Sequence, residues 1–273
     1  MNNPLDDLRA VLEPIARQQG IDLSQLDPDQ LVAALDDETI EEMLLPILQD
    51  EERARFNKFN DLFPDDGPLR RELYPKHLEF FRVGREYRER CFMAANRVGK
   101  TVAGGYETTA HLTGQYPHWW EGARFGKRIR AWAAGDTNET TRDIIQLELL
   151  GEVTTGKDGR KAFDGSGLIP RECIGQPKWK AGVQDLADTV PIKHASGKWS
   201  SLAFKSFDQG RRSFQGTAKE LIWLDEECPL DVYSECLIRT ATTRGLVLTT
   251  FTPLKGLSEN VLQFLPKDMR PGE

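Results

Sequence analysis

Residues 94–101, Ala94-Ala95-Asn96-Arg97-Val98-Gly99-Lys100-Thr101, follow an apolar run and open a helical pattern. They fit the pattern G-x-x-x-x-G-K-[ST], except that Ala94 stands where the first glycine belongs. In such loops successive backbone N–H groups surround phosphates, and the positive end of the helix dipole adds a partial charge. We therefore predict a phosphate-binding loop in which residues 95–101 contact a nucleotide.

Three residues of this loop have separate roles in the pattern. Gly99 lets the backbone approach the phosphates, Lys100 reaches the β- and γ-phosphates, and Thr101 offers its hydroxyl to Mg²⁺. Ala94 is compatible with the loop provided that its position does not need a positive φ. The alternative is an incidental Gly-Lys-Thr between a strand and a helix, and the strand and helix context argues against it.

A second motif is the acidic end of an apolar run, Leu221-Ile222-Trp223-Leu224-Asp225-Glu226-Glu227. Adjacent carboxylates at a strand end are costly to bury without a cation, and Mg²⁺ bound to ATP supplies one. We predict that Asp225 holds the Mg²⁺ and that Glu226 polarises the attacking water as general base, with Glu227 as the next candidate. The alternative is an exposed acidic turn, which the upstream phosphate-binding loop makes less plausible.

A third motif is Leu246-Val247-Leu248-Thr249-Thr250-Phe251-Thr252-Pro253, an apolar run that ends in hydroxyls. Hydroxyls at a strand end beside the γ-phosphate can detect it through hydrogen bonds. The alternative is the ordinary preference of threonine for strands, which explains Thr249 but not the continuation into Thr252-Pro253.

Short apolar runs alternate with helical patterns from residue 69 onward. The runs lie at 91–95, 129–134, 221–224 and 246–250. Helices are predicted at 100–113 and 137–150, and this alternation favours an α/β fold with a mostly parallel sheet covered on both faces. Residues 154–167 are predicted as an insertion loop and residues 199–207 as one arm of a β-hairpin.

The charge of the chain is unevenly distributed. The 273 residues carry a net charge of −7, but residues 1–60 alone carry −9 and the remainder +2. We predict an acidic helical appendage at residues 1–62 and a phosphate-loop domain at residues 63–273, because Pro64-Asp65-Asp66-Gly67-Pro68 is typical of a loop. A near-neutral domain can carry a local basic surface, so the composition leaves binding of nucleic acid open.

Other classes of protein are less consistent with the sequence. No apolar stretch approaches the length of a transmembrane helix, and the first residues do not resemble a secretory signal. The four cysteines form no C-x-x-C pair, which indicates reduced thiols rather than disulfides or a zinc site. We expect no membrane association.

Together the three motifs resemble the ATPase domain of large terminases from tailed bacteriophages. The similarity covers residues 69–262 and includes Lys205-Ser206-Phe207-Asp208-Gln209-Gly210-Arg211-Arg212-Ser213-Phe214-Gln215-Gly216. Phosphate loops of the family often carry arginine where Arg97 stands and tolerate a missing first glycine, as at Ala94. The resemblance implies a three-layer, RecA-like P-loop ATPase with ATP and Mg²⁺ as cofactors.

The resemblance also implies roles for individual residues. Family members read the adenine with a segment before the first strand, where Tyr74 is available for stacking. They couple hydrolysis to DNA movement through the strand-end motif that is here Thr250-Phe251-Thr252.

An arginine that stabilises charge on the γ-phosphate is expected as well. Ring-forming terminases supply it from a neighbouring subunit in the part of the chain that holds Arg211 and Arg212. Arg97 acting within its own subunit is the alternative, and Arg239 or Arg244 are further candidates.

The function implied by the resemblance is ATP hydrolysis coupled to translocation of double-stranded DNA into a viral procapsid. The implied partners are a portal protein, a small terminase subunit and sister subunits in a homo-oligomeric ring, in the host cytoplasm and transiently docked on the portal. A helicase-like DNA-remodelling ATPase and a non-hydrolysing nucleotide-binding module are the alternatives.

The sequence ends at Glu273, soon after the third motif, whereas family members continue into a nuclease domain. We expect the chain to be the motor domain alone, a fragment rather than an encoded short motor. No nuclease activity is expected from it, because its only dense carboxylate cluster after residue 63 is assigned to ATP.

Overall fold

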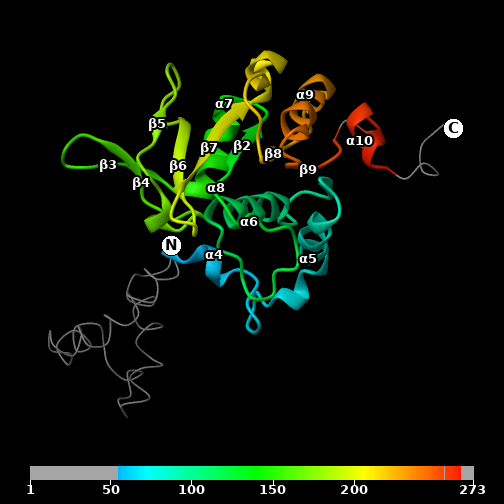
Figure 1. Cartoon of the computed structure of the whole chain (residues 1–273), viewed down its shortest axis with the longest axis horizontal. Coiled ribbons are helices and arrows are strands. Elements are labelled where there is room, and N and C mark those ends of the chain that lie inside the picture. The colour runs from blue at the N-terminus through cyan, green and yellow to red at the C-terminus, as the bar shows by residue number, and fades with distance from the viewer. Residues whose placement is uncertain (1–54, 255, 266–273) are drawn as a thin grey trace, which may run out of the picture. The chain divides into compact units, whose positions relative to one another are not determined.

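The computed structural model describes residues 55–254 and 256–265. The predicted helices of residues 1–54 lie outside these described residues. The helices are α4 (Lys58–Asp61), α5 (Pro75–Arg82), α6 (Lys100–Thr113), α7 (Asn138–Thr140), α8 (Leu147–Leu150), α9 (Leu230–Ala241) and α10 (Glu259–Phe264) (Figure 1). The strands are β1 (Glu89–Met93), β2 (Arg130–Gly135), β3 (Val153–Thr155), β4 (Lys161–Phe163), β5 (Lys178–Trp179), β6 (Ala187–Lys193), β7 (Trp199–Ser206), β8 (Leu221–Asp225) and β9 (Leu246–Phe251).

The chain divides into two compact units, Met1–Arg55 and Phe56–Glu273. All the elements named above belong to the second unit. The predicted boundary between residues 62 and 63 stays a prediction. In the part of the chain that the structure describes, no helix has the length and apolar character needed to cross a membrane.

The second unit contains a seven-stranded sheet in the order β1-β9-β8-β2-β7-β6-β5. The first five strands run parallel, whereas β6 and β5 are antiparallel to their neighbours. The prediction of a mostly parallel sheet is therefore confirmed, and the four predicted apolar runs become β1, β2, β8 and β9. The carboxyl ends of the five parallel strands meet at one edge of the sheet.

Other predicted segments differ in detail. The predicted hairpin arm is β7, which pairs with β6 but also lies parallel to β2. The predicted insertion loop contains a separate two-stranded sheet, β3 with β4. The helix predicted at residues 137–150 is present and includes one π-helical turn, Thr141–Gln146, between α7 and α8.

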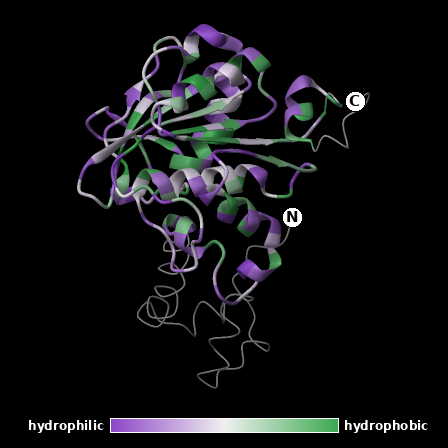
Figure 2. Cartoon of the chain, turned by 45° about the vertical axis from the view of Figure 1, so that its right-hand side comes forward, coloured by the Kyte–Doolittle hydropathy of each residue, from purple (hydrophilic) through white to green (hydrophobic). Residues whose placement is uncertain are grey.

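Each face of the sheet packs into its own hydrophobic core. On one face, Tyr106 of α6 packs with Ala133, Trp223 and Leu248 of the central strands. On the other, Tyr233 of α9 belongs to a second core; its strand residues are Trp132, Ala134, Ile222, Leu224 and Val247. Hydrophobic segments follow the central strands in Figure 2, with hydrophilic segments on the outer loops. The result is the predicted three-layer arrangement of helix, sheet and helix.

A buried ion pair joins α6 to the edge strand β1. Arg90 of β1 donates to Glu107 of α6 at 2.6 Å, and both side chains are almost completely buried. Glu107 also contacts His111 at 3.1 Å, while Arg90 donates to the carbonyl of Phe80 in α5. Because breaking a buried charge pair leaves an unpaired charge, this contact holds the middle of α6 against the beginning of β1.

Close packing of α6 on β8 depends on a glycine. Trp223 of β8 is fully buried, and a Cβ placed on Gly104 of α6 would lie 2.2 Å from its Nε1. Glycine inside a helix costs roughly 1 kcal/mol relative to alanine. Glycine is present at position 104 in spite of this cost because the indole of Trp223 needs the space between α6 and β8.

We expect Gly104→Ala to lower the free energy of unfolding by roughly 1–3 kcal/mol, because the added methyl group overlaps the buried indole of Trp223. Urea unfolding followed by circular dichroism measures the change. Gly126→Ala is the matched control, because a Cβ there meets no atom within 4 Å. Equal midpoints for the two variants would contradict this account of the packing.

Candidate active site

The carboxyl ends of β1, β9 and β8 lie side by side and bring the three sequence motifs together. The loop after β1 turns into α6 at Lys100. Gly99 has a φ of 83°, in the left-handed region that favours glycine, and a Cβ there would lie 2.9 Å from Nε2 of His77. Ala94 is not among the described residues with positive φ, so the loop does not require a glycine at its first position.

Most residues of the loop are exposed, whereas the ammonium group of Lys100 is buried. Ala95, Asn96, Arg97 and Val98 are exposed. Lys100 is only 8% exposed, and its Nζ donates to the carbonyl oxygen of Ala95 at 2.7 Å. An exposed loop around a fixed ammonium group is suited to binding phosphates.

Asp225 is the point of contact between the first two motifs. The Thr101 hydroxyl lies 3.0 Å and 3.3 Å from the two carboxylate oxygens of Asp225, which is 4% exposed. Burial raises the pKa of the Asp225 carboxyl to about 7, although hydrogen bonds from Thr250 and Thr101 oppose the rise. A buried carboxylate beside a hydroxyl provides hard oxygen ligands, the kind that Mg²⁺ prefers, so these residues fit the predicted metal.

Thr250 of the third motif also contacts Asp225. Its hydroxyl donates to Oδ1 of Asp225 at 2.5 Å and accepts a hydrogen bond of 2.8 Å from Nε1 of Trp223. Both Thr250 and Trp223 are buried. The indole therefore orients the hydroxyl, and the hydroxyl orients the carboxylate. No signal in the sequence singled out Trp223, because a tryptophan in a buried strand is ordinarily a packing residue.

Glu226 has an unusual backbone conformation. Its φ is 81°, and its N–H donates to the carbonyl of Thr250 at 2.8 Å. A non-glycine residue in this region costs on the order of 1–3 kcal/mol, and such strain clusters at functional sites. Its side chain is exposed, as expected for a group that must reach a water molecule.

A further carboxylate, Asp136, lies close to Glu226. Partial burial raises the pKa of Glu226, the Lys100 ammonium lowers it, and Asp136 raises it again. β2 and β8 are parallel neighbours with Ala134 beside Leu224, so the register brings Asp136 next to Glu226. Asp136 was not predicted from the sequence, because its position beside Glu226 depends on which strand lies next to β8.

Phe251 and Thr252, which follow Thr250 in the third motif, contact other residues. The Thr252 hydroxyl donates to Oδ1 of Asn96 in the phosphate loop at 2.7 Å. Phe251 is buried, and its carbonyl accepts a hydrogen bond from the N–H of Ala94 at 3.3 Å. Thr250 thus contacts the metal-ligand candidate, whereas Thr252 contacts the loop itself.

The segment before β1 contacts the loop through His77 rather than Tyr74. Nε2 of His77 lies 3.3 Å from the carbonyl oxygen of Gly99, and burial lowers the pKa of this histidine. Tyr74 is half-buried and packs edge-on against Phe63 and His77. No pattern in the sequence singles out His77, because its contact with Gly99 joins residues that only the fold brings together.

The two candidate arginines after β7 differ in their surroundings. Nε of Arg211 donates to Glu235 at 2.9 Å, and Arg239 binds the other oxygen of the same buried carboxylate at 3.0 Å. Arg212 is exposed, and its side chain forms no hydrogen bond or ion pair with any other residue that the structure describes. Arg97 is exposed with a φ of 62°.

Comparisons with known proteins agree on one family. Residues 91–271 match the family model described as "Terminase large subunit, T4likevirus-type, N-terminal". The chain is 36% identical over 247 residues to the terminase large subunit of Salmonella phage P22, with 84% of this chain and 46% of that protein covered. The chain therefore spans about half the length of this curated relative.

Two solved structures are similar in part. Both are of the large terminase from the thermophilic bacteriophage D6E, and each similarity covers 65% of this chain and 37% of that one. Crystal form 2 is 11% identical with a TM-score of 0.41. The complex with ADP, crystal form 3, is 12% identical with a TM-score of 0.44.

We expect Trp223→Phe to weaken the binding of Mg²⁺ together with ADP by about 10- to 100-fold, because Thr250 loses the donor that orients it toward Asp225. Calorimetric titration of ADP with and without Mg²⁺ measures this, and binding without the metal should change much less. The matched control is Trp120→Phe, which removes a 2.9 Å hydrogen bond to Ala123 elsewhere in the fold. Equal Mg²⁺ dependence in both variants would argue against an orienting role for Trp223.

Proposed function

The chain belongs to the family of terminase large subunits, and we propose that it is an ATP-hydrolysing motor that moves double-stranded DNA into a viral procapsid. The family supports a role in phage DNA packaging. The observation that carries the ATPase assignment is the contact between Thr101 and Asp225. It joins the phosphate loop to an acidic strand end 124 residues away in sequence.

In the proposed reaction a water molecule attacks the γ-phosphorus of ATP, and the bond to the β–γ bridging oxygen breaks. Glu226 accepts a proton from the attacking water, which suits its exposed side chain and raised pKa. Lys100 offsets negative charge on the β- and γ-phosphates from inside the loop. Mg²⁺ held by Asp225 and Thr101 would offset the remaining phosphate charge.

Coupling to DNA movement is proposed to begin at the bond between Thr252 and Asn96. This bond connects the phosphate loop directly to the end of β9. Loss of the γ-phosphate changes what the loop contacts, and a change in the position of Asn96 passes to Thr252. The segment after β9 is thereby linked to the state of the nucleotide.

The arginine that completes the site is proposed to be Arg212 of a neighbouring subunit. Arg211 is held by the buried Glu235, which it shares with Arg239, so withdrawing Arg211 would remove one of the two cations that compensate this carboxylate. Arg212 is exposed and free to reach another molecule. The proposal implies a homo-oligomeric ring that docks on a portal protein in the host cytoplasm and receives DNA from a small terminase subunit.

We expect the chain to release phosphate from ATP, with a higher rate when double-stranded DNA is added. Glu226→Gln should keep ATP binding but lower turnover by about 10²- to 10⁴-fold, because an amide cannot accept the proton of the water. Lys100→Ala should instead weaken ATP binding, because it removes the ammonium held in the loop.

Glu227→Gln is the matched control for Glu226→Gln, since it neutralises the next carboxylate along the chain. A phosphate-release assay and a separate ATP-binding measurement distinguish the variants. If Glu226→Gln hydrolyses ATP at the wild-type rate and Glu227→Gln does not, Glu227 is the general base. If the wild-type chain with DNA releases no phosphate, the proposed motor function is wrong.

We expect Arg212→Ala to lower turnover in the assembled ring by up to about 10³- to 10⁵-fold, as for other trans-acting arginines. Arg211→Ala serves as the comparison and should act mainly on stability. Mixing inactive Arg212→Ala with inactive Glu226→Gln should restore part of the activity, because some interfaces pair an intact arginine with an intact glutamate. With ring assembly confirmed by native mass spectrometry, a mixture that stays inactive would refute action between subunits and favour Arg97.

A further inference from the structure

The face of the sheet opposite α6 is only partly covered where β7, β6 and β5 form it. Leu202 and Phe204 of β7 lie in the core under α6, so the alternate residues of that strand point to the other face. The helix α9, on this side, packs over β8 and β9 (Figure 1). We define the open face by the residues of the three strands on this side: Trp199, Ser201, Ala203 and Lys205 of β7, Thr189, Pro191 and Lys193 of β6, and Lys178 of β5.

The centre of the open face is a floor of short side chains, with Trp199 at one end beside Lys193. Pro191 pairs with Ser201, and Thr189 pairs with Ala203 on one side and Lys178 on the other. In these pairs all residues except Lys178 are half-exposed. Short side chains at the centre of the floor allow a large, rigid partner to approach the strands closely there.

Positive charge converges at one side of this floor. Nζ of Lys205 lies 5.7 Å from the centre of the Trp132 ring, and Nζ of Lys219 lies 4.7 Å from the same ring. Lys180 is close by: its Nζ donates to Oδ1 of Asn138 at 2.7 Å. Burial lowers the pKa of Lys180, and the charge of Lys205 lowers it further. Three ammonium groups thus gather where their mutual repulsion is unfavourable without an anion.

Carboxylates near these lysines offset only part of the charge. Glu220 is paired with Arg130, whose Nη2 and Nε donate to the two carboxylate oxygens at 2.9 Å and 3.2 Å. Asp188 and Asp208 act on Lys180 through their charges. Lys180, Lys205 and Lys219 form no salt bridge with any residue in the described ranges. The open face and its margin are therefore left with a surplus of positive charge.

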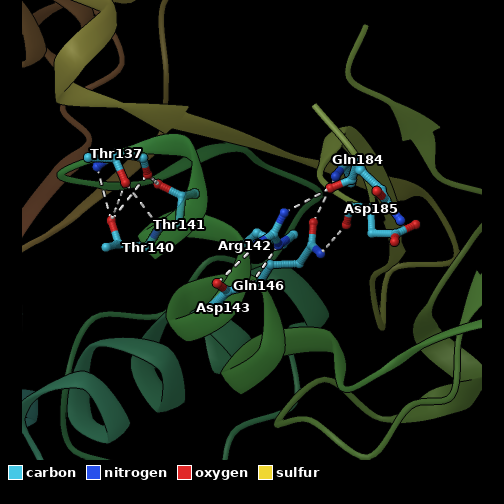
Figure 3. Close-up of polar contacts among 9 residues, drawn as sticks. Thr137, Thr140, Thr141, Arg142, Asp143, Gln146, Gln184 and Asp185 are labelled. Carbon is cyan, nitrogen blue, oxygen red and sulfur yellow. Dashed lines mark hydrogen bonds and ion pairs between the residues drawn. The ribbon is translucent and has the colours of Figure 1, made fainter. Parts of the chain in front are cut away.

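The margin of the open face is held in place by the helical segment after β2 (Figure 3). Arg142 donates to the carbonyl of Gln184 at 3.2 Å, and Gln146 donates to the carbonyl of Asp185 at 2.7 Å. These bonds fix the connection from β5 to β6 that begins at Lys180. The Thr141 hydroxyl donates to a backbone carbonyl of β7 at 3.0 Å. Cations on a fixed framework lose little conformational entropy on binding.

We propose that the open face binds the phosphate backbone of double-stranded DNA. DNA carries one negative charge per about 1.7 Å of its axis, so lysines on three neighbouring strands can contact several phosphates at once. A protein partner would be expected to bury a hydrophobic centre, but the exposed Trp199 lies at the end of the floor beside Lys193, and the centre of the floor at Ser201, Ala203 and Thr189 offers little apolar surface. The inference rests on the proposed motor function and names the surface through which the motor contacts its DNA.

The test is fluorescence anisotropy with the full chain and a labelled double-stranded DNA at several salt concentrations. The variant is Lys178→Gln/Lys193→Gln/Lys205→Gln. We expect it to bind on the order of 10²-fold more weakly near 0.1 M salt, because each phosphate contact contributes about 0.9 to the slope of log K against log salt. The slope should fall by roughly 2–3, and phosphate release without DNA should stay at the wild-type rate.

A matched control removes three positive charges from exposed positions outside the open face. This control is Arg85→Gln/Arg88→Gln/Lys157→Gln. The single variants Lys178→Gln and Lys193→Gln, at exposed positions, should each show a smaller loss and a slope lower by about 0.9. They keep the test informative if the triple variant folds poorly.

Each outcome decides between the proposals. If the wild-type chain binds DNA and the triple variant binds it equally well, the open face is not the DNA surface and its lysines face an acidic protein partner. The proposed motor function survives that result. If the control variant loses as much affinity as the triple variant, the loss comes from the lower net charge of the protein. The open face is then not the DNA-binding surface. If the wild-type chain does not bind DNA, both proposals fail.

Discussion

The buried carboxylate of Asp225 is the constraint on which the site depends. It is almost completely removed from water, and hydroxyls from two other motifs, Thr101 and Thr250, donate to it. An unpaired buried carboxylate would be costly, so these bonds are as much a condition for the fold as for the chemistry. Trp223 completes the arrangement, because its indole orients Thr250 from within the core.

The order of the strands makes this arrangement possible. β9 lies between β1 and β8, so the third motif reaches both the phosphate loop and the acidic strand end. Thr250 turns to Asp225 and Thr252 to Asn96, two residues apart on one strand end. Gly104 lets α6 lie close enough to β8 for the indole to fit between them. Packing and polar contacts therefore specify the same register.

The segment after β2 borders both the nucleotide site and the open face. Asp136, its first residue, lies beside Glu226. A few residues later, Asn138 binds Lys180, and Thr141 binds a carbonyl of β7. The segment contains a π-helical turn, a feature common at functional sites. The surroundings of Glu226, the proposed general base, and the open face are thus joined by one short, hydrogen-bonded piece of chain.

The sequence by itself determined the fold class and the local identity of the three motifs. Gly99-Lys100-Thr101 after a strand and Asp225-Glu226 at the end of another need only local geometry to be recognised, because backbone N–H groups, a helix start and a strand end are properties of neighbouring residues. Only the tertiary structure decided which side chains meet. The pairing of Arg211 with Glu235, the contact of His77 with Gly99 and the nearness of Asp136 to Glu226 all follow from strand order and helix packing. Those contacts join residues far apart in sequence, and neither periodicity nor composition carries information about which distant elements become neighbours.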